Sequence, residues 1–576
     1  MQDTQDYKVW REREVFIIAT IIGLLTGVAA WAFRLLIGLI HNLAFYGHFS
    51  VDYDANLHAD PSTWGWFVIF VPVIGGVGVI WLIKNFAPEA KGHGVPEVMD
   101  AVYHRQGRMR GGVSIVKAFA SALTIGTGGS LGREGPIVMI CSAFSSTIGQ
   151  WLKMPMSQRN LMIACGAAGG IAATFNAPLG GIMFAIELLL LSVNRYTVVP
   201  VIISAVIAAN IGRWLIGPDP AFHISTTDLV VGADSPLILA IYFPFAALVG
   251  LVALLFIRGI YWSEEWFEQL PLGPYQRHML GMLILGLLFQ GMYLYFGHYY
   301  VQGVGYATIQ DLVTRTLTSP GFILLILGAK MLATMLTIGS GGSGGVFSPS
   351  LFLGATLGGA FGYGLVALFP EIGVDPAAFA LVGMASMVAA TTSAPMTAAI
   401  MTYEMTLDYG VVLPVMVGVA VAYAVRHHFS EGDIYTIKLL RRGRNVPQGR
   451  YTDLNSHVVI DDIMDTSIKF VKADDLITGS DQTCCVINDE GAVIGVIYSI
   501  SYRKGIEFRA RDAMVTEFIT VQSGMTLRQV FQKIKKHEQS VAMVTTDGSI
   551  NAKKVTGVVS PFNLTLAMAH ASQLHV

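Results

Sequence analysis

Two glycine-rich turns contain the residues of this sequence whose types and spacing could do chemistry. Residues 129–136 read GSLGREGP and residues 342–349 read GSGGVFSP, and the proline of each turn opens an apolar segment. A glycine turn that leads into a helix leaves several backbone N–H groups unpaired, with the positive end of the helix dipole behind them. Because such helix ends bind anions, two of them aimed at one place predict a site for a small anion. For either turn taken alone, close packing of helices through small residues is the alternative.

Only the first turn contains ionisable residues. Arg133 and Glu134 stand where the second turn has Val346 and Phe347. A carboxylate at a helix N-terminus ordinarily stabilises that helix. In an apolar setting, however, an ionisable group is costly and indicates function. Glu134 could occupy the anion site itself and leave it on protonation, which would make it both a gate and a proton carrier.

The elements that must position these turns are membrane helices. Of the 576 residues, 53% are hydrophobic and only 13% are charged, whereas soluble domains carry about a quarter charged residues. Apolar segments recur from about residue 15 to residue 425, and several of roughly 12 to 16 residues are too short to cross a ~30 Å hydrocarbon core as straight helices. The sequence therefore predicts an all-α polytopic membrane protein with tilted and re-entrant helices.

An internal duplication relates the two turns. Two pairs of segments recur in the same order, residues 117–136 with 330–349 and residues 166–178 with 383–395. In the second pair each terminal proline precedes a glutamate by nine residues, Glu187 in one copy and Glu404 in the other. Two repeats, at approximately 64–216 and 277–425, thus predict a transport site between paired, interrupted hydrophobic segments.

The charge distribution indicates the topology and the partners. Basic residues gather at the N-terminus, at residues 104–110 and at residues 438–444, so both termini are expected in the cytoplasm. A chain this compact suits a multi-pass protein of a bacterial plasma (inner) membrane. There is no basic face with interleaved aromatics for nucleic acid, no cysteine spacing typical of a metal site, and no nucleophile–base arrangement of an enzyme. A lipid bilayer and small inorganic anions are the expected partners, with no cofactor required.

Three segments and one late tyrosine resemble a known family. Residues 92–96 (GHGVP), residues 129–136 and residues 345–349 (GVFSP) resemble the three signature segments of the CLC chloride channel and transporter family, and Tyr435, in GDIYTIKLLRRG, matches its pore tyrosine. The resemblance covers roughly residues 15–445. It implies an inverted-repeat homodimer with one chloride pathway in each subunit.

The resemblance also implies roles for individual residues. Glu134 is expected to be the external gate. The external anion is expected to be bound by backbone amides of Arg133, Glu134 and Gly135, together with Phe347 and Ser348. The central anion is expected to be bound by the amides of Val346 and Phe347 and by the hydroxyl of Tyr435.

The first signature departs from the family pattern. The family usually reads GSGIP there, with the serine hydroxyl reaching the central anion, but this chain has His93 before Gly94. The imidazole could donate to the anion, add positive charge when protonated, or turn away and leave binding to the backbone of His93 and Gly94. All three alternatives stay open, and so does the identity of the preferred anion.

A second departure concerns proton coupling. Proton-coupled members typically carry two consecutive glutamates at the place where this chain has Glu187 followed by Leu188. Leucine cannot relay a proton, and channel members also have an apolar residue there. We therefore expect a passive chloride channel gated by Glu134, with Glu187 as a buried structural or pathway-lining acid. A Cl⁻/H⁺ antiporter that uses another proton route is the alternative.

The polar tail is expected to form a separate domain. We predict a membrane domain over residues 1–440 and a small α+β cytoplasmic domain over residues 441–576. The tail resembles a degenerate pair of CBS modules, with DDIM at 461–464 and DAM at 512–514 as module openings. The second module is expected to contain a helix over residues 526–537.

The end of the second module bears on nucleotide binding. Residues 557–563, GVVSPFN, approximate the ribose-contacting pattern of nucleotide-binding CBS pairs, with Asn563 in place of the usual aspartate. Ser560 and Asn563 are therefore the candidate nucleotide contacts. The matching segment of the first module, residues 495–501, lacks an acid. A structural dimerisation module is favoured over a sensor of adenine nucleotide.

Overall fold

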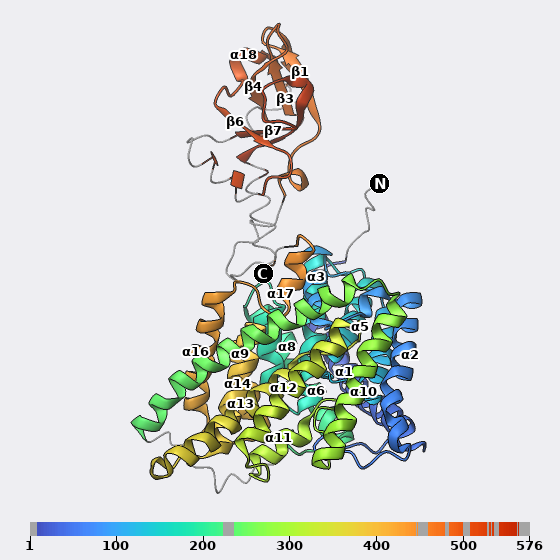
Figure 1. Ribbon diagram of the computed structural model, residues 1–576. Coiled ribbons are helices and arrows are strands. Elements are labelled where there is room, and N and C mark those ends of the chain that lie inside the picture. The colour runs from blue at the N-terminus through green and yellow to red at the C-terminus, as the bar shows by residue number, and fades with distance from the viewer. Residues whose placement is uncertain are drawn as a thin grey trace. The chain divides into compact units, whose positions relative to one another are not determined.

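The chain divides into two compact units, Met1–Val446 and Pro447–Val576. The computed structural model describes residues 8–222, 235–444, 446, 459–478, 483–498, 507–526, 529–530, 533–534, 541–561 and 563. The first unit is helical and the second contains the strands (Figure 1). Across these described residues, eight helices are long and apolar enough to cross a membrane.

The helices of the first unit confirm the expected all-α polytopic fold. In chain order they are α1 (Glu12–Tyr46), α2 (Val71–Phe86), α3 (Val95–His104), α4 (Gly112–Gly126), α5 (Glu134–Trp151), α6 (Met156–Phe175), α7 (Pro178–Leu188), α8 (Arg195–Leu215), α9 (Pro236–Gln269), α10 (Pro274–Phe296), α11 (Tyr306–Val313), α12 (Pro320–Gly339), α13 (Phe347–Leu368), α14 (Pro376–Thr392), α15 (Pro395–Thr406), α16 (Val412–Phe429) and α17 (Thr436–Arg441). The 12 residues of α15 extend about 18 Å, which is well short of a ~30 Å hydrocarbon core. Such helices end inside the protein, as the short apolar segments predicted.

The helix breaks follow the same local rule in both repeats. α6 ends at Asn176 (φ 55°) and α14 ends at Ser393 (φ 56°), each in the left-handed conformation. Two residues later, Pro178 and Pro395 occupy the first position of α7 and α15. A left-handed residue ends a helix, and proline suits the first turn of the next one because that turn needs no N–H donor.

Reciprocal hydrogen bonds join the two repeats. The amide of Gly132 donates to the carbonyl of Gly345 at 2.7 Å, and the amide of Gly345 donates to the carbonyl of Gly132 at 2.7 Å. The serine amides likewise bond to threonine hydroxyls of the opposite repeat, Ser130 to Thr337 at 3.3 Å and Ser343 to Thr124 at 3.4 Å. Bonds exchanged in both directions are the mark of two-fold pairing. The two halves therefore form the inverted repeat that the fold class requires.

The duplication extends to a pair of loops that the sequence alignment did not include. The loop before α3 contains Gly92 (φ 78°) and Gly94 (φ 91°), and the loop before α11 contains Gly303 (φ 56°) and Gly305 (φ 83°). A buried lysine of the same repeat binds the carbonyls of each loop, Lys117 those of Ala90 and Gly92, and Lys330 those of Val301 and Gly303. Thus α3 and α11 are matching helices. They were not recognised in the sequence because they are short and not strongly apolar.

The second unit is itself built from two matching halves. One sheet contains β1 (Ile468–Lys472), β3 (Thr483–Ile487) and β4 (Val493–Ile497), and the other contains β6 (Phe518–Gln522), β7 (Val541–Thr545) and β8 (Val555–Val559). In both sheets the first two strands are parallel and the last two are antiparallel, with a bulge near the end of the middle strand. A two-stranded sheet pairs β2 (Leu476–Thr478) with β5 (Glu507–Arg509).

The two halves of the second unit pack against each other. A Cβ atom on Gly495 of β4 would lie 2.7 Å from Sδ of Met514, and one on Gly557 of β8 would lie 2.3 Å from Sδ of Met464. Met464 and Met514 end the two predicted module openings, so each opening packs on the sheet of the opposite half. The helix expected over residues 526–537 falls mostly outside the described residues. The units divide after Val446, whereas the expected boundary was 440/441.

Candidate anion pathway

The glycine segments bring three helix N-termini together. A Cβ atom on Gly135 would lie 2.3 Å from the carbonyl oxygen of His93, and one on Gly345 would lie 2.7 Å from the Gly135 nitrogen. Neither space admits a side chain, so the three segments lie backbone to backbone. Gly94, Arg133 and Val346 are the N-caps of α3, α5 and α13. The unpaired N–H groups and positive dipole ends of these helices therefore meet in one region.

Glu134 lies buried against this junction. Its carboxylate oxygen Oε1 accepts a hydrogen bond of 2.5 Å from the hydroxyl of Tyr306, which is 3.0 Å from the hydroxyl of Ser348. Its other oxygen, Oε2, has no hydrogen-bond partner among the residues that the structure describes. A Cβ atom on Gly132 would lie 2.2 Å from Oε2. The carboxylate is thus folded back over the glycine turn, with one oxygen held and one free.

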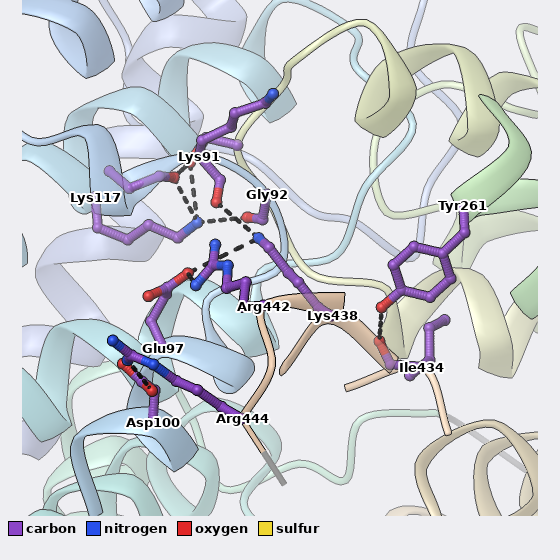
Figure 2. A network of polar contacts seen from close by, with 12 residues as sticks. Lys91, Gly92, Glu97, Asp100, Lys117, Tyr261, Ile434, Lys438, Arg442 and Arg444 are labelled. Carbon is purple, nitrogen blue, oxygen red and sulfur yellow. Dashed lines mark hydrogen bonds and ion pairs between the residues drawn. The ribbon is translucent and has the colours of Figure 1, made fainter. Parts of the chain in front are cut away.

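A cavity extends from Glu134 to Tyr435. Its lining consists of Glu134, Gly135, Phe347 and Tyr435 together with Val95, Val138, Ile171, Phe175, Phe184 and Met401. None of these lining residues is basic, so an anion here would depend on backbone dipoles and the tyrosine hydroxyl. The backbone next to Tyr435 is held in place, because the hydroxyl of Tyr261 donates to the carbonyl of Ile434 at 2.8 Å (Figure 2).

A second, polar cavity is lined in part by Tyr306, the hydrogen-bond partner of Glu134. Its lining includes Arg34, Asn56, Arg133, Asn176, Asp219 and Tyr306. The guanidinium of Arg133 is 5.5 Å from the centre of the Tyr306 ring. We call this second cavity the vestibule and the first cavity the chamber. Tyr306 lines the vestibule and Glu134 lines the chamber, so the bonded pair lies between the two. The vestibule is lined by arginine and aspartate side chains, whereas the lining of the chamber is mostly apolar.

Comparison with known proteins agrees with this geometry. The sequence profile of the voltage gated chloride channel family matches residues 75–427, which is more than half of the chain. The chain belongs to this family, the CLC family. It is 31% identical to an H(+)/Cl(-) exchange transporter ClcA of Vibrio parahaemolyticus, over 75% of this chain and 90% of that one. It is 32% identical to a putative chloride channel protein ClcB-like of Ralstonia nicotianae, over 65% of this chain and 86% of that one.

Solved CLC structures share the fold. A slow cyanobacterial Cl⁻/H⁺ antiporter is 25% identical in sequence to this chain, with a TM-score of 0.62. The match covers 76% of this chain and 99% of the antiporter chain. A eukaryotic CLC transporter, 20% identical with a TM-score of 0.63, covers 95% of this chain and 97% of its own. The protein is therefore a multi-pass CLC membrane protein that transports chloride, and membership of a channel and transporter family confirms that it is not an enzyme.

His93, at the position of the usual CLC serine, does not line the cavity. Its side chain is fully buried, and neither ring nitrogen has a hydrogen-bond partner within the described part of the chain. The ring centre is 6.4 Å from that of Tyr261, and Lys117 and Lys438 are close enough to interact with it electrostatically. The imidazole therefore does not line the cavity between Glu134 and Tyr435, and its role toward an anion stays a prediction.

Glu187, the acid before Leu188, is held by the opposite CLC repeat. Its carboxylate accepts bonds from the Met396 amide (3.0 Å), the Thr397 amide (2.7 Å) and the Thr397 hydroxyl (2.6 Å), at the start of α15. In return, Glu404 of α15 accepts bonds from the first amides of α7 at 3.0 and 2.6 Å. Leu188 is buried. Glu187 therefore caps a helix, and its side chain is half-buried rather than buried as expected.

Basic residues after Tyr435 hold α17 against α3 at one end of the first unit (Figure 1). Arg442 bonds to Glu97 at 2.8 Å and Arg444 bonds to Asp100, and both acids belong to α3 (Figure 2). Lys438 lies 3.9 Å from Glu97. The segment that carries Tyr435 is thus tied to the helix that begins at Gly94.

In the C-terminal unit, Ser560 and Asn563 bond to each other. The side-chain oxygen of Asn563 accepts from the Ser560 amide at 3.1 Å and from its hydroxyl at 2.5 Å, and the side-chain Nδ2 of Asn563 donates to the carbonyl of Ile463 at 3.2 Å. These side chains thus stabilise the turn after β8 and join it to the segment that ends the first module opening. No group of three or more His, Cys, Asp or Glu side chains that could hold a metal ion occurs in the described residues.

Sequence reasoning missed Tyr306, whose hydroxyl bonds to the Glu134 carboxylate. The residue follows a glycine loop, and GVGYA at 303–307 has the same glycine spacing as GHGVP at 92–96. Two shared glycines are a weak signal, and only the matching lysine bonds establish the correspondence.

Proposed function

We propose that the protein is a passive chloride channel in which Glu134 is the gate. The observation that carries this proposal is the position of the Glu134 carboxylate between the vestibule and the chamber. In that position the ionised side chain occupies the site that would otherwise receive an anion. Protonation removes its charge and its need for donors, and the side chain can then leave.

The anion would bind mainly to backbone groups. In our proposal the amides of Arg133, Glu134 and Gly135, with Phe347 and Ser348, hold the external anion. The amides of Val346 and Phe347 and the hydroxyl of Tyr435 hold the central anion, with the backbone of His93 and Gly94 beside it. Helix N-termini suit this task because they attract an anion without the strong binding of a full positive charge.

Leu188 supports the passive mode. A buried leucine cannot accept a proton, and the neighbouring Glu187 already accepts three hydrogen bonds. Glu404, the matching acid of the second repeat, accepts two. Neither acid is free to replace the second glutamate of proton-coupled members.

Cl⁻/H⁺ exchange is the alternative function. It is favoured by relatives named as H(+)/Cl(-) exchange transporters, of which those from Vibrio cholerae are 35% identical over 58% of this chain. Such an exchanger would need a proton route from the chamber that bypasses Leu188.

The orientation and assembly belong to the same proposal. The N-terminal Lys8 bonds to the loop after α5 at Lys153, and Arg159, which follows this loop, bonds to the basic segment at Gln106. Arg444 joins the third basic segment to α3. These basic segments gather at one end of the helical unit, which we assign to the cytoplasm of a bacterial inner membrane. We propose a homodimer with one pathway per subunit and a CBS-like C-terminal pair that assists dimerisation without nucleotide.

Flux from liposomes tests the proposal. The purified protein is reconstituted, and chloride efflux and proton movement are recorded together under a chloride gradient. A channel moves chloride down its gradient without net proton movement. Reproducible uphill proton pumping would establish exchange instead. Glu134→Ala is expected to give flux without pH dependence, and unchanged pH dependence in this variant would remove Glu134 as the gate.

A further inference from the structure

The hydroxyl of Tyr306 bonds directly to the carboxylate of Glu134, across the boundary between the two repeats. We propose that Tyr306 is a latch: a positioning residue that holds the ionised Glu134 side chain in the closed position. This inference rests on the proposed gating role of Glu134, and it adds the residue that sets how acidic the solution must be before the gate opens.

The ring of Tyr306 is held rigidly. It is the first residue of α11, directly after Gly305 at φ 83°, and its side chain is buried. Lys330 fixes the preceding loop through the carbonyls of Val301 and Gly303, at 3.2 and 2.8 Å. The Tyr306 ring also packs edge-on against Phe222, with centres 5.3 Å apart. Because the ring cannot easily move, the hydroxyl presents a fixed donor to the carboxylate.

The polar and charged groups around the Glu134 carboxylate have different hydrogen-bond partners. Arg133 beside it, Lys330 of α12 and Tyr435 before α17 are near enough to interact electrostatically with this region. Lys330 donates to loop carbonyls, and Arg133 faces the vestibule. The Tyr306 hydroxyl is the group that donates to Glu134 itself. A donor of this kind stabilises the ionised carboxylate more than the protonated acid.

The latch breaks the symmetry of the repeats. The residue that matches Tyr306 in the first repeat is Val95, and the residue that matches Glu134 in the second repeat is Phe347. Both of these apolar residues line the chamber. The donor and the acceptor of the latch therefore come from opposite repeats, and the second, symmetry-related pair contains neither a donor nor an acceptor.

Tyr306→Phe tests the latch because it removes the hydroxyl and keeps the ring. Chloride efflux is measured in liposomes as a function of pH. Loss of the donor is expected to move the pH of half-maximal flux upward by about one unit, a tenfold change in proton concentration. Incorporation of 3-fluorotyrosine at position 306 makes the phenol a stronger donor and is expected to move the midpoint downward. Tyr299→Phe is the matched control, because the hydroxyl of this buried tyrosine bonds to the Ser62 amide instead.

Combination with Glu134→Ala separates the latch from the gate. In the Glu134→Ala background, Tyr306→Phe is expected to leave flux unchanged, because the latch has nothing to hold. If Glu134→Ala abolishes the pH dependence but Tyr306→Phe and the fluorinated variant behave as the wild type, the latch is refuted and the gate stands. If Tyr306→Phe alters flux equally in both backgrounds, the tyrosine acts on the pathway directly and the latch is also refuted. Retained pH dependence in Glu134→Ala refutes the gate.

Discussion

Glu187→Gln distinguishes a helix cap from a proton-pathway residue. The glutamine oxygen can keep the two bonds with Thr397, but the new NH₂ group then faces the Met396 amide, donor against donor. The substitution loses one charge-assisted bond and weakens two others. At about 1.5–3 kcal/mol for a bond to a charged group and about 1 kcal/mol for a neutral one, and with Glu187 only partly buried, we expect a loss of about 2–4 kcal/mol.

The assay measures stability and transport on the same samples. Thermal unfolding of the detergent-solubilised Glu187→Gln protein is expected to begin on the order of 5 °C lower than that of the wild type. Chloride efflux and its pH dependence are expected to change little. Glu404→Gln is the matched variant, because Glu404 caps α7 through two bonds in the same way. Wild-type stability together with altered proton movement in Glu187→Gln alone would place this acid on the pathway and refute the capping argument.

Three further predictions address the site and the tail. Glu134→Ala is expected to abolish the pH dependence of chloride efflux, as measured in liposomes between acidic and neutral pH. Gly345→Ala places a methyl group 2.7 Å from the Gly135 nitrogen and is expected to abolish flux or folding, whereas Gly328→Ala, with open space around its Cβ, is expected to behave as the wild type in size-exclusion chromatography and flux. Asn563→Ala is expected to lower the unfolding temperature without changing calorimetric binding of adenine nucleotide, which we expect to be absent in both proteins.

The sequence predicts the helices of the membrane unit well and the side-chain contacts poorly. The apolar segments near 134–151 and 346–369 correspond to α5 and α13 within a residue or two, because burial in lipid and protein imposes continuous hydrophobicity. α3 and α11 were missed because they are short and contain polar residues that interrupt the apolar pattern. Their positions depend on loop glycines and on buried lysines that bind backbone carbonyls, and neither requirement produces a periodic pattern.

The candidate site shows the same division. The glycine segments could be recognised from the sequence. Their close backbone contacts require residues without side chains, and such residues are visible in the sequence as glycines. The orientation of His93 could not be recognised, because serine and histidine at that position fill different spaces and only the packing decides which way the ring turns. Tyr306 could not be assigned either, since its partner Glu134 is 172 residues away in the chain.

The duplicated fold also accounts for the single proton-sensitive gate that we propose. The contacts that build the scaffold occur twice: the paired glycine turns, the lysine-bound loops, and the glutamate caps of α7 and α15. The polar groups at the gate occur once, because Glu134 and Tyr306 have Phe347 and Val95 as their counterparts. In our proposal, protonation therefore acts at one position of a scaffold whose other contacts are duplicated. An acid at Leu188 would add a titratable group directly after the Glu187 cap, so we expect Leu188→Glu to introduce proton movement coupled to chloride without changing the architecture.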